Sequence, residues 1–200
     1  MHEIELKAIV PDAGAVRTRL VAAGAVCVFA GSMTDRLYDT AENALSDSDH
    51  VLRLRVRRPA AGRGAPGASL DWKGPTRRDG GYKEREELSA AVVDDDATDA
   101  VLRALGYSVT MEIDREIELF DLGGMVVRIE QYPRLDVLIE VEGEPEAIER
   151  AITLMGIPRA AFSANRLVDF VADYERRTGA RAAISLRELS GDYRFLRSRG

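Results

Sequence analysis

Ionised side chains recur at every second position in several short segments of the chain. The first segment carries Glu3, Glu5 and Lys7, and a later one carries Glu140 and Glu142. Side chains two residues apart on a β-strand lie on the same face of the sheet, so each segment places these groups side by side. Carboxylate oxygens are the ligands that hard divalent cations such as Mg²⁺ prefer. The spacing therefore predicts a metal-binding face.

Basic residues show the same two-residue spacing. Arg53 and Arg55 share one face of a predicted strand, and a guanidinium can donate two parallel hydrogen bonds to a phosphate group. The other charged strand faces supply further cations and carboxylates: Lys73, Arg85, Arg115, Arg128, Glu87 and Glu130. Cations that hold a polyanion, together with carboxylates that hold a divalent ion, are typical of a site for a metal-bound phosphate chain.

The strands that position these residues have one charged and one apolar face. Such strands can form a sheet whose charged face is open to water, which is common in antiparallel proteins. They can also form a barrel whose charged faces enclose a solvated lumen. A dry core is excluded, because each unpaired buried ion costs several kcal/mol against a total stability of about 5–15 kcal/mol. Several strands share the pattern and amphipathic helices are available to cover the apolar faces, which favours the barrel.

Periodicity along the chain predicts an α+β protein. Helices are expected over residues 11–24, 94–106, 145–156, 160–177 and 182–197. Strands are expected over residues 3–7, 34–39, 51–57, 69–73, 85–89, 110–120, 125–132 and 138–142. We expect one domain over 1–178, with 179–200 as its helical extension, which would pack over the barrel, close one mouth or join a partner subunit.

Charge and composition exclude several classes of function. The chain has 28 basic and 34 acidic residues among its 200, so its net charge is −6, which argues against general affinity for nucleic acid or an anionic membrane. A single cysteine, Cys27, cannot form an internal disulfide. No apolar run approaches the roughly 20 residues of a membrane span, and the N-terminus lacks a signal pattern. We expect a cytoplasmic monomer or homodimer that acts on a small molecule.

Several of these segments, taken in order, resemble the CYTH superfamily of triphosphate tunnel metalloenzymes, which includes class IV adenylate cyclases, thiamine triphosphatases and inorganic triphosphatases. Residues 3–7 resemble the N-terminal Glu-x-Glu-x-Lys signature. The blocks that follow in family order are Tyr38 to Thr40, Leu52 to Arg55, Trp72 to Pro75, Lys83 to Glu87, Arg115, Glu130 and Leu138 to Glu142. The resemblance extends to near residue 175.

The resemblance implies an antiparallel eight-stranded β-barrel, with helices packed on its outside, whose tunnel holds a triphosphate and one or two Mg²⁺ or Mn²⁺ ions. The implied triphosphate-binding residues are Arg53, Arg55, Lys73, Arg85 and Arg115. The implied metal ligands are Glu3, Glu5, Glu130, Glu140 and Glu142. Two positions depart from the family pattern: Ile113 stands where members often have lysine, and Glu130 stands where aspartate is usual.

Lys7 and Tyr38 are the candidate catalytic residues. Lys7 follows two glutamates on one strand face, and a cationic lumen would lower its pKa, so that it could orient or help deprotonate an attacking water. Tyr38 could assist Lys7, or it could be a half-buried aromatic residue without a catalytic role. The acidic residues Glu112, Asp114, Glu116 and Glu118 lie on the face opposite Ile113, Arg115 and Ile117 and are expected on the outer face.

Three functions fit these residues. The favoured one is divalent-metal-dependent hydrolysis of inorganic, nucleoside or thiamine triphosphate. In the first alternative, a class IV adenylate cyclase, the ribose hydroxyl of ATP attacks the α-phosphate and gives cyclic AMP. The second alternative is a non-catalytic polyphosphate- or nucleotide-binding module, against which the presence of Glu3, Glu5 and Lys7 counts.

Overall fold

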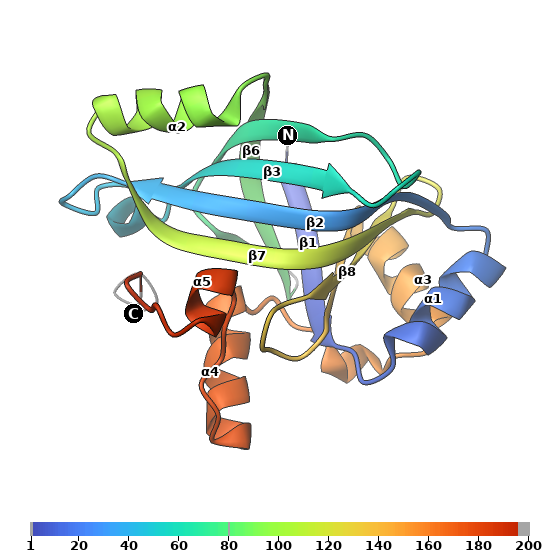
Figure 1. Cartoon of the computed structure of the whole chain (residues 1–200). Helices are drawn as coiled ribbons and strands as arrows, with labels where there is room; N and C mark the ends of the chain where they lie inside the picture. Colours follow the sequence, from blue (N-terminus) through green and yellow to red (C-terminus); the bar gives the residue numbers. More distant parts are fainter. Residues whose placement is uncertain (1, 80, 196–200) are drawn as a thin grey trace.

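A computed structural model describes residues 2–79 and 81–195, with the backbone alone for residues 2, 3, 78 and 79 (Figure 1). Its strands are β1 (His2–Ile9), β2 (Val26–Asp39), β3 (Val51–Pro59), β4 (Gly67–Lys73), β5 (Arg77–Asp79), β6 (Tyr82–Val92), β7 (Ser108–Asp121), β8 (Val126–Gln131) and β9 (Leu138–Glu142). Its helices are α1 (Ala13–Ala22), α2 (Asp95–Ala104), α3 (Pro145–Met155), α4 (Leu167–Thr178) and α5 (Leu186–Leu189).

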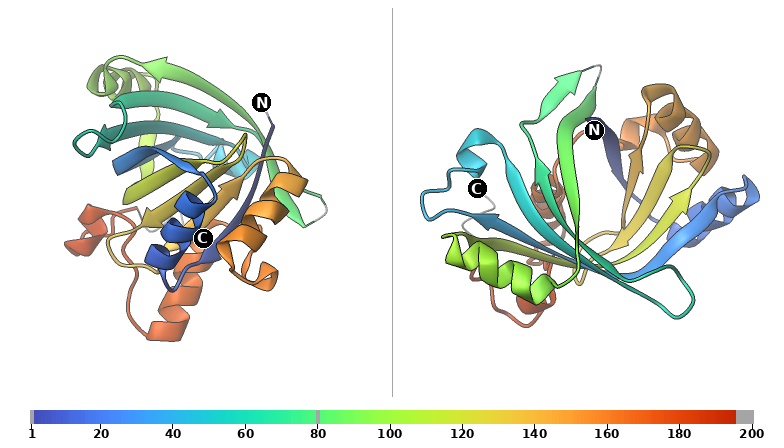
Figure 2. Two further views of the ribbon diagram at one scale, coloured as in Figure 1. Left: turned by 90° about the vertical axis from the view of Figure 1, so that its right-hand side faces the viewer. Right: turned by 90° about the horizontal axis from the view of Figure 1, so that it is seen from above.

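Eight of the strands close into an antiparallel barrel. Hydrogen-bonded neighbours follow the order β1-β9-β8-β7-β2-β3-β4-β6, and a further pairing of β6 with β1 closes the ring. The short strand β5 pairs with β6 beyond the ring. Seen from above, the strands surround a central space, with α1 and α3 on one side and α2 on another (Figure 2). The predicted eight-stranded barrel with outer helices is confirmed.

Several strands turn an apolar face outward against helices. On the side of β1, β8 and β9, the fully buried residues Leu6, Val127 and Ile139 pack with Leu20 of α1 and Ile148 of α3. Because side chains alternate along a strand, this packing turns the ionised residues between them toward the barrel interior. The helices therefore determine which face of the sheet becomes the lumen.

Two further helices, α2 and α4, pack against other parts of the barrel. Leu102 of α2 packs against Leu54 of β3 and Tyr38 of β2. Val171 of α4 packs against residues of β7 and against Ile184 of the chain that follows. None of the helices in residues 2–79 and 81–195 is long and apolar enough to cross a membrane.

The first three helices lie where the sequence predicts them. The carboxylates of Asp12 and Asp94 each accept a hydrogen bond of 2.9 Å from a backbone N–H in the first turn of α1 and α2. At the C-terminal end of α3, Gly156 adopts the left-handed conformation (φ +65°) that favours glycine and ends helices. These local signals are sufficient to place a helix without knowledge of its tertiary contacts.

The C-terminal segment differs from the prediction. The expected helix over 182–197 is wrong, because only Leu186–Leu189 is helical within 182–195. Before it, Ala183 forms an antiparallel bridge with Arg134, and the Ile184 carbonyl accepts a hydrogen bond of 2.8 Å from the Asp114 N–H. The backbone of this segment thus forms hydrogen bonds with the barrel instead of the hydrogen bonds of a helix. Likewise, α4 begins at Leu167, later than the helix expected over 160–177.

Candidate functional site

A cavity of about 280 Å³ lies inside the barrel. Nine of its lining side chains are basic: Lys7, Arg53, Arg55, Lys73, Lys83, Arg85, Arg115, Arg128 and Arg166. Five are acidic: Glu5, Asp35, Glu87, Glu130 and Glu140. Within a chain whose net charge is −6, the cavity thus has an excess of four positive charges. Such a lining favours an anionic ligand.

The ammonium of Lys7 lies between two carboxylates from neighbouring strands. Its Nζ is 3.0 Å from Glu5 Oε1, and it also forms an ion pair with Glu140, the residue directly opposite on β9. Glu5 forms a second ion pair with Lys83, its direct neighbour across the β1–β6 pair. The carboxylates of Glu5 and Glu140 therefore converge on one cation position. Sequence reasoning did not single out Lys83, although it lies in one of the family-like blocks.

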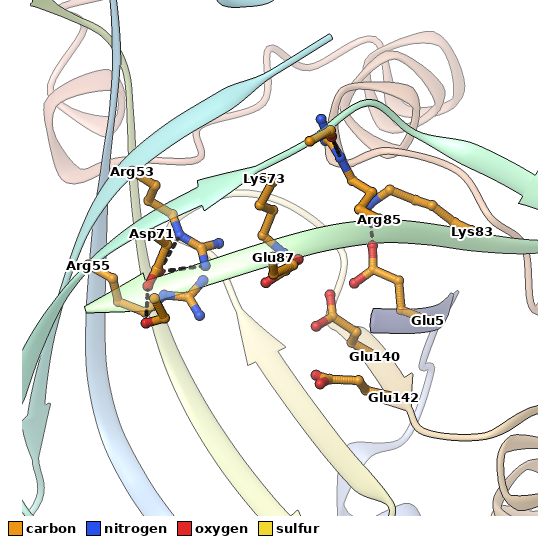
Figure 3. A network of polar contacts seen from close by, with 12 residues as sticks. Glu5, Arg53, Arg55, Asp71, Lys73, Lys83, Arg85, Glu87, Glu140 and Glu142 are labelled. Carbon is orange, nitrogen blue, oxygen red and sulfur yellow. Dashed lines mark hydrogen bonds and ion pairs between the residues drawn. The ribbon is translucent and has the colours of Figure 1, made fainter. Parts of the chain in front are cut away.

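Arg128 contacts three glutamates of the predicted metal set. Its Nη1 is 2.5 Å from Glu140 Oε1 and 3.6 Å from Glu130 Oε1, and its Nη2 is 3.8 Å from Glu142 Oε2. The Glu142 side chain is 30 % exposed, compared with 6 % for Glu140, so Glu142 lies toward the edge of the cluster. Figure 3 shows Glu5, Glu140 and Glu142 on one side of the interior.

Asp35 organises the arginines on the other side. Arg55 donates to both of its carboxylate oxygens, at 2.8 and 2.9 Å, and Arg115 donates to Oδ2 at 2.9 Å. Arg53 lies 3.7 Å from the same carboxylate and donates to Asp71 at 2.8 Å. Asp35 is only 1 % exposed, so this buried carboxylate holds two guanidiniums by hydrogen bonds and, together with Asp71, keeps a third beside them. Sequence reasoning missed the roles of Asp35 and Asp71.

Arg115 has one buried hydrogen-bond donor without a partner in the part of the chain that the structure describes. Its Nε donates to Glu130 at 3.0 Å and its Nη2 donates to Asp35. Its Nη1 is buried and has no hydrogen-bond partner among residues 2–79 and 81–195. A buried donor without an acceptor costs about 1–3 kcal/mol, so an acceptor supplied by a ligand would be favourable here.

Lys73 lies between the glutamates near Lys7 and the arginines near Asp35, and Arg85 lies beside them. Lys73 forms an ion pair with Glu87, its direct neighbour across β4 and β6, and Figure 3 shows this pair between the arginines and the glutamates. Arg85 donates from Nε to the Gly74 carbonyl at 2.6 Å and from Nη2 to the Asp49 carbonyl. The structure therefore brings all five predicted triphosphate-binding residues to the wall of one cavity.

The pKa values of the two lysines beside Glu5 move in opposite directions. Burial alone would lower the pKa of Lys7, but Glu140 and Glu5 outweigh burial and raise it. Burial, opposed by Glu5 and assisted by Lys7, lowers the pKa of Lys83. The expectation that a cationic lumen lowers the pKa of Lys7 is therefore wrong, because its nearest neighbours are carboxylates. Lys7 is an ammonium in this arrangement and not a free base.

Tyr38 does not join the other candidates. Its ring packs on the outer face of the barrel against Leu54 and Leu102, and its hydroxyl donates a hydrogen bond to Asp99 of α2. The placement corrects the hypothesis that Tyr38 assists Lys7, because the barrel wall separates the two side chains. Glu3 lies in β1 opposite Arg85, but its side chain is outside the part of the chain that is described.

The acidic residues of β7 lie on the outer face, as predicted. Asp114 accepts hydrogen bonds from the Thr34 hydroxyl and from the Leu186 N–H, at 2.8 and 2.9 Å. Glu118 forms a part-buried ion pair with Arg17 of α1. These contacts attach helices and the C-terminal segment to the barrel, so this group is structural.

A comparison with known families agrees with this geometry. The profile of the CYTH domain matches residues 1–153, which is more than half of the chain. The chain belongs to the CYTH family. Members of this superfamily are triphosphatases or adenylate cyclases. No curated protein sequence matches the chain.

Solved structures share the CYTH fold with low sequence identity. A proposed adenylate cyclase from Vibrio parahaemolyticus superposes with a TM-score of 0.73 at 17% identity, over 86% of this chain and 98% of that one. A protein from Pyrococcus horikoshii OT3 gives 0.69 at 21% identity, over 86% and 98%. A proposed adenylyl cyclase from Hippeastrum with dominant triphosphatase activity gives 0.60 at 17% identity, over 88% and 96%. At these identities the likeness shows the fold alone.

The two departures from the CYTH pattern have structural counterparts. Ile113 lines the cavity and also packs with Val171 and Ile184, so an apolar contact with α4 and the C-terminal segment replaces the usual lysine. Glu130 accepts hydrogen bonds from Arg115 and, at 2.7 Å, from the Tyr132 hydroxyl. The longer glutamate is thus held on the wall by two donors.

The donor set fits a divalent cation bound together with substrate. Mg²⁺ commonly takes one or two protein carboxylates and completes its shell with water and phosphate oxygens. Glu5 and Glu140 supply two carboxylates that converge on the Lys7 ammonium. Among residues 2–79 and 81–195, no three acidic, histidine or cysteine side chains form a group that could hold a metal ion by themselves. The remaining ligands would have to come from water or substrate.

Proposed function

We propose that this CYTH protein is a divalent-metal-dependent triphosphatase. The observation that carries this assignment is the cavity with nine basic and five acidic side chains inside an acidic protein. A triphosphate chain is a compact polyanion, and its charge complements the excess of four positive charges on the wall.

The arginine side of the cavity would bind the phosphate chain. Asp35 holds Arg53, Arg55 and Arg115 in fixed positions, so little side-chain freedom is lost when a phosphate binds them. The unused Nη1 of Arg115 gives at least one phosphate oxygen a buried donor. Preorganised donors of this kind stabilise charge that develops on phosphate oxygens during transfer.

The glutamate side would hold the cation. CYTH proteins are generally metal-dependent, and Glu5 and Glu140 would hold Mg²⁺ or Mn²⁺, with Glu130 and Glu142 next to them. The bound ion would neutralise phosphate oxygens and lower the pKa of a coordinated water. Lys7, an ammonium next to both carboxylates, would orient the substrate or the attacking water by hydrogen bonds. Water adds to the terminal phosphorus as the bond to the bridging oxygen breaks. Orthophosphate and a diphosphate that keeps the bridging oxygen leave, and a proton passes to solvent.

Adenylate cyclase is the second candidate. A second cavity of about 670 Å³ shares lining residues with the tunnel cavity and is large enough for a nucleoside. In that reaction, the ribose hydroxyl of ATP would attack the α-phosphorus, and diphosphate would leave. The same cations could hold the phosphate chain in either reaction.

Product analysis separates the candidates. Purified protein is incubated with Mg²⁺ or Mn²⁺ and with inorganic triphosphate, ATP or thiamine triphosphate, and the products are separated by ion-exchange chromatography. We expect orthophosphate. Cyclic AMP with diphosphate would establish the cyclase instead. Tight binding of triphosphate without any product would indicate a binding module, and neither binding nor product would refute all three assignments.

A further inference from the structure

Carboxylates from two neighbouring strands hold two of the three guanidinium nitrogens of Arg115. Its Nε donates to Glu130 Oε1 of β8 at 3.0 Å, and its Nη2 donates to Asp35 Oδ2 of β2 at 2.9 Å. The strand that carries Arg115, β7, lies between β2 and β8 in the barrel. Because a guanidinium is planar and rigid, two anchored nitrogens determine where the third lies. Glu130 therefore helps to place Nη1, the donor that has no partner in the described part of the chain.

Tyr132 holds the carboxylate of Glu130 in turn. Its hydroxyl donates to Glu130 Oε2 at 2.7 Å, so the two oxygens of Glu130 accept hydrogen bonds from different residues. The ring of Tyr132 packs on the apolar cluster that contains Ile113 of β7 and Val171 of α4. The Arg115 guanidinium lies 5.8 Å from the centre of this ring. Because packing fixes the ring, its hydroxyl can hold the Glu130 carboxylate in one orientation.

These three side chains form a hydrogen-bonded unit in the wall of the tunnel cavity. Arg115, Glu130 and Tyr132 all line this cavity. Arg115 is 7 % exposed and Glu130 is 2 % exposed, so water has little access to the hydrogen bond between them. Hydrogen bonds are stronger in such a low-dielectric setting, and a satisfied buried network makes its members rigid. The unit is therefore suited to fix the direction of a phosphate-binding donor.

A metal ion at Glu130 would disrupt this unit. Arg128 contacts both Glu130 and the proposed metal ligand Glu140, with Nη1 at 3.6 Å from Glu130 Oε1 and 2.5 Å from Glu140 Oε1. A cation bound to either oxygen of Glu130 would displace Arg115 or Tyr132. Metal binding by Glu130 and the positioning of Arg115 therefore compete for the same two oxygens.

We infer that Glu130 and Tyr132 are positioning residues for Arg115, and that Glu130 is not a ligand of the metal ion. This inference rests on the proposed function and adds to it the residues that prepare one donor for the phosphate chain. Tyr132 acts on Glu130, Glu130 acts on Arg115, and Arg115 alone contacts a phosphate oxygen, through Nη1. A donor that is held in place before the ligand arrives loses little freedom on binding, so the phosphate chain binds more tightly.

Two substitutions that keep the charge of the cavity test the inference. Glu130→Asp shortens the side chain by one methylene, so the carboxylate no longer reaches both Arg115 and Tyr132, and Tyr132→Phe removes only a hydroxyl. The dissociation constant of inorganic triphosphate is measured by isothermal titration calorimetry in excess chelator. A hydrogen bond to a charged group is worth about tenfold in an equilibrium constant, so we expect the dissociation constant to rise about tenfold in Glu130→Asp and by a smaller factor in Tyr132→Phe.

The metal requirement provides a second, independent measurement. The Mn²⁺ concentration that gives half-maximal activity is determined for the wild type and for both variants. Because the inference places Glu130 outside the metal site, we expect this concentration to stay within about twofold of the wild-type value. A residue that served only the stability of the fold would change neither quantity in a correctly folded variant, which a melting curve for each variant verifies.

A double variant and a matched control show whether the two residues act in sequence. Because the Tyr132 hydroxyl acts through Glu130, adding Tyr132→Phe to Glu130→Asp should not weaken triphosphate binding further. Tyr82→Phe is the control, since the Tyr82 hydroxyl also donates to a glutamate, Glu149 of α3, at 2.6 Å but outside the barrel. We expect Tyr82→Phe to bind triphosphate as the wild type does.

Other results would overturn the inference. If Glu130→Asp and Tyr132→Phe bind triphosphate as tightly as the wild type, these residues do not position Arg115. If Glu130→Asp raises the Mn²⁺ requirement about tenfold and leaves the dissociation constant unchanged, Glu130 is a metal ligand instead. The binding measurement needs neither metal nor turnover, so a wild type that binds triphosphate without releasing phosphate would refute the proposed function alone. A wild type that binds no triphosphate would refute both.

Discussion

Lys7 and Glu140 lie directly opposite each other on β1 and β9, and the Lys7 ammonium is shared between Glu140 and Glu5. All three side chains are at most 11 % exposed. Two buried carboxylates that meet at one monovalent cation provide the arrangement for which a divalent cation can compete. The ion pairs of this structure and the proposed metal site are therefore two uses of the same residues.

Replacing Lys7 by alanine tests this relationship. Lys7→Ala removes the cation that Glu5 and Glu140 share, and removal of one partner from a buried ion pair typically costs about 3–5 kcal/mol. Because Glu5 keeps Lys83 and Glu140 keeps Arg128 as partners, the lower end of this range applies. Without metal, we expect urea unfolding to show a loss of this size in the free energy of unfolding. Mg²⁺ should stabilise the variant more than the wild type, and turnover should be lower. Arg103→Ala is the control, because the Arg103 side chain is 54 % exposed and its partner Asp99 also accepts a hydrogen bond from Tyr38. Equal stability of Lys7→Ala and wild type, with no added effect of Mg²⁺, would contradict the shared site.

Glu5→Gln tests the proposed metal ligand. Glutamine keeps the size of the side chain but removes a full ligand charge, so we expect kcat/KM to fall by orders of magnitude and the Mn²⁺ concentration needed for activity to rise. Far-UV circular dichroism should be unchanged. Glu149→Gln is the matched control, since the Glu149 side chain on α3 is 41 % exposed and pairs with Arg159 outside the barrel. Full activity in Glu5→Gln would show that Glu5 is not a metal ligand.

Asp35→Asn tests the anchor of the arginine cluster. The substitution leaves Arg53, Arg55 and Arg115 facing one another without their common carboxylate. We expect a loss of about 3–5 kcal/mol in the free energy of unfolding. Inorganic triphosphate should then raise the melting temperature of the variant more than that of the wild type, because the ligand replaces the missing negative charge. A variant as stable as the wild type would show that Asp35 does not organise these arginines.

The effect of Asp35 should depend on pH. Burial alone would raise the pKa of Asp35, but Arg115, Arg55 and Arg53 hold it well below its usual value in the folded protein. A carboxyl with a lowered folded pKa stabilises the fold above its unfolded pKa of about 3.9, and this contribution is lost as the pH falls toward the folded pKa. The difference in stability between wild type and Asp35→Asn should therefore be largest near neutral pH and shrink in acid. A difference in stability that grows in acid would contradict this prediction.

Tyr38→Phe tests the correction made to the candidate catalytic pair. The variant loses one hydrogen bond to Asp99, which is worth about 1 kcal/mol of stability, and keeps the packing against Leu54. We expect kcat and KM to remain within about twofold of the wild type, measured beside a melting curve. Asp99→Asn should give a similar loss of stability. A tenfold fall in kcat without a loss of stability would show that Tyr38 has a catalytic role.

Much of the barrel follows from the alternation of charged and apolar residues. Glu5 and Lys7, like Arg53 and Arg55, identify their strand face from sequence because ionised residues recur at the two-residue spacing. Asp35 carries no such signal, since the positions two residues away are Met33 and Leu37. Its importance arises from the pairing of β2 with β3, which places it opposite Arg55. Contacts between strands of unknown register cannot be deduced from the pattern of one strand.

Two errors have the same physical origin. The direction of the Lys7 pKa depends on which charges are nearest, and Glu140 is separated from Lys7 by most of the chain. The apolar spacing of Ile184 and Leu186 fits a helix, but Ile184 instead pairs with β7. Tyr38, by contrast, lies an odd number of positions from Asp35 on the same strand. Once Asp35 is known to face the lumen, this spacing places the Tyr38 side chain on the outer face of the barrel.

The dependence of phosphate release on a divalent cation tests the proposed chemistry most directly. Purified wild-type protein is incubated with inorganic triphosphate or ATP in the presence of Mg²⁺ or Mn²⁺, and in parallel with excess chelator, and released orthophosphate is measured over time. Because the two carboxylates next to Lys7 are proposed to hold the ion, we predict rapid release with metal and none above the uncatalysed rate with chelator. Equal release under both conditions, or none with any triphosphate and metal, would contradict a metal-dependent triphosphatase.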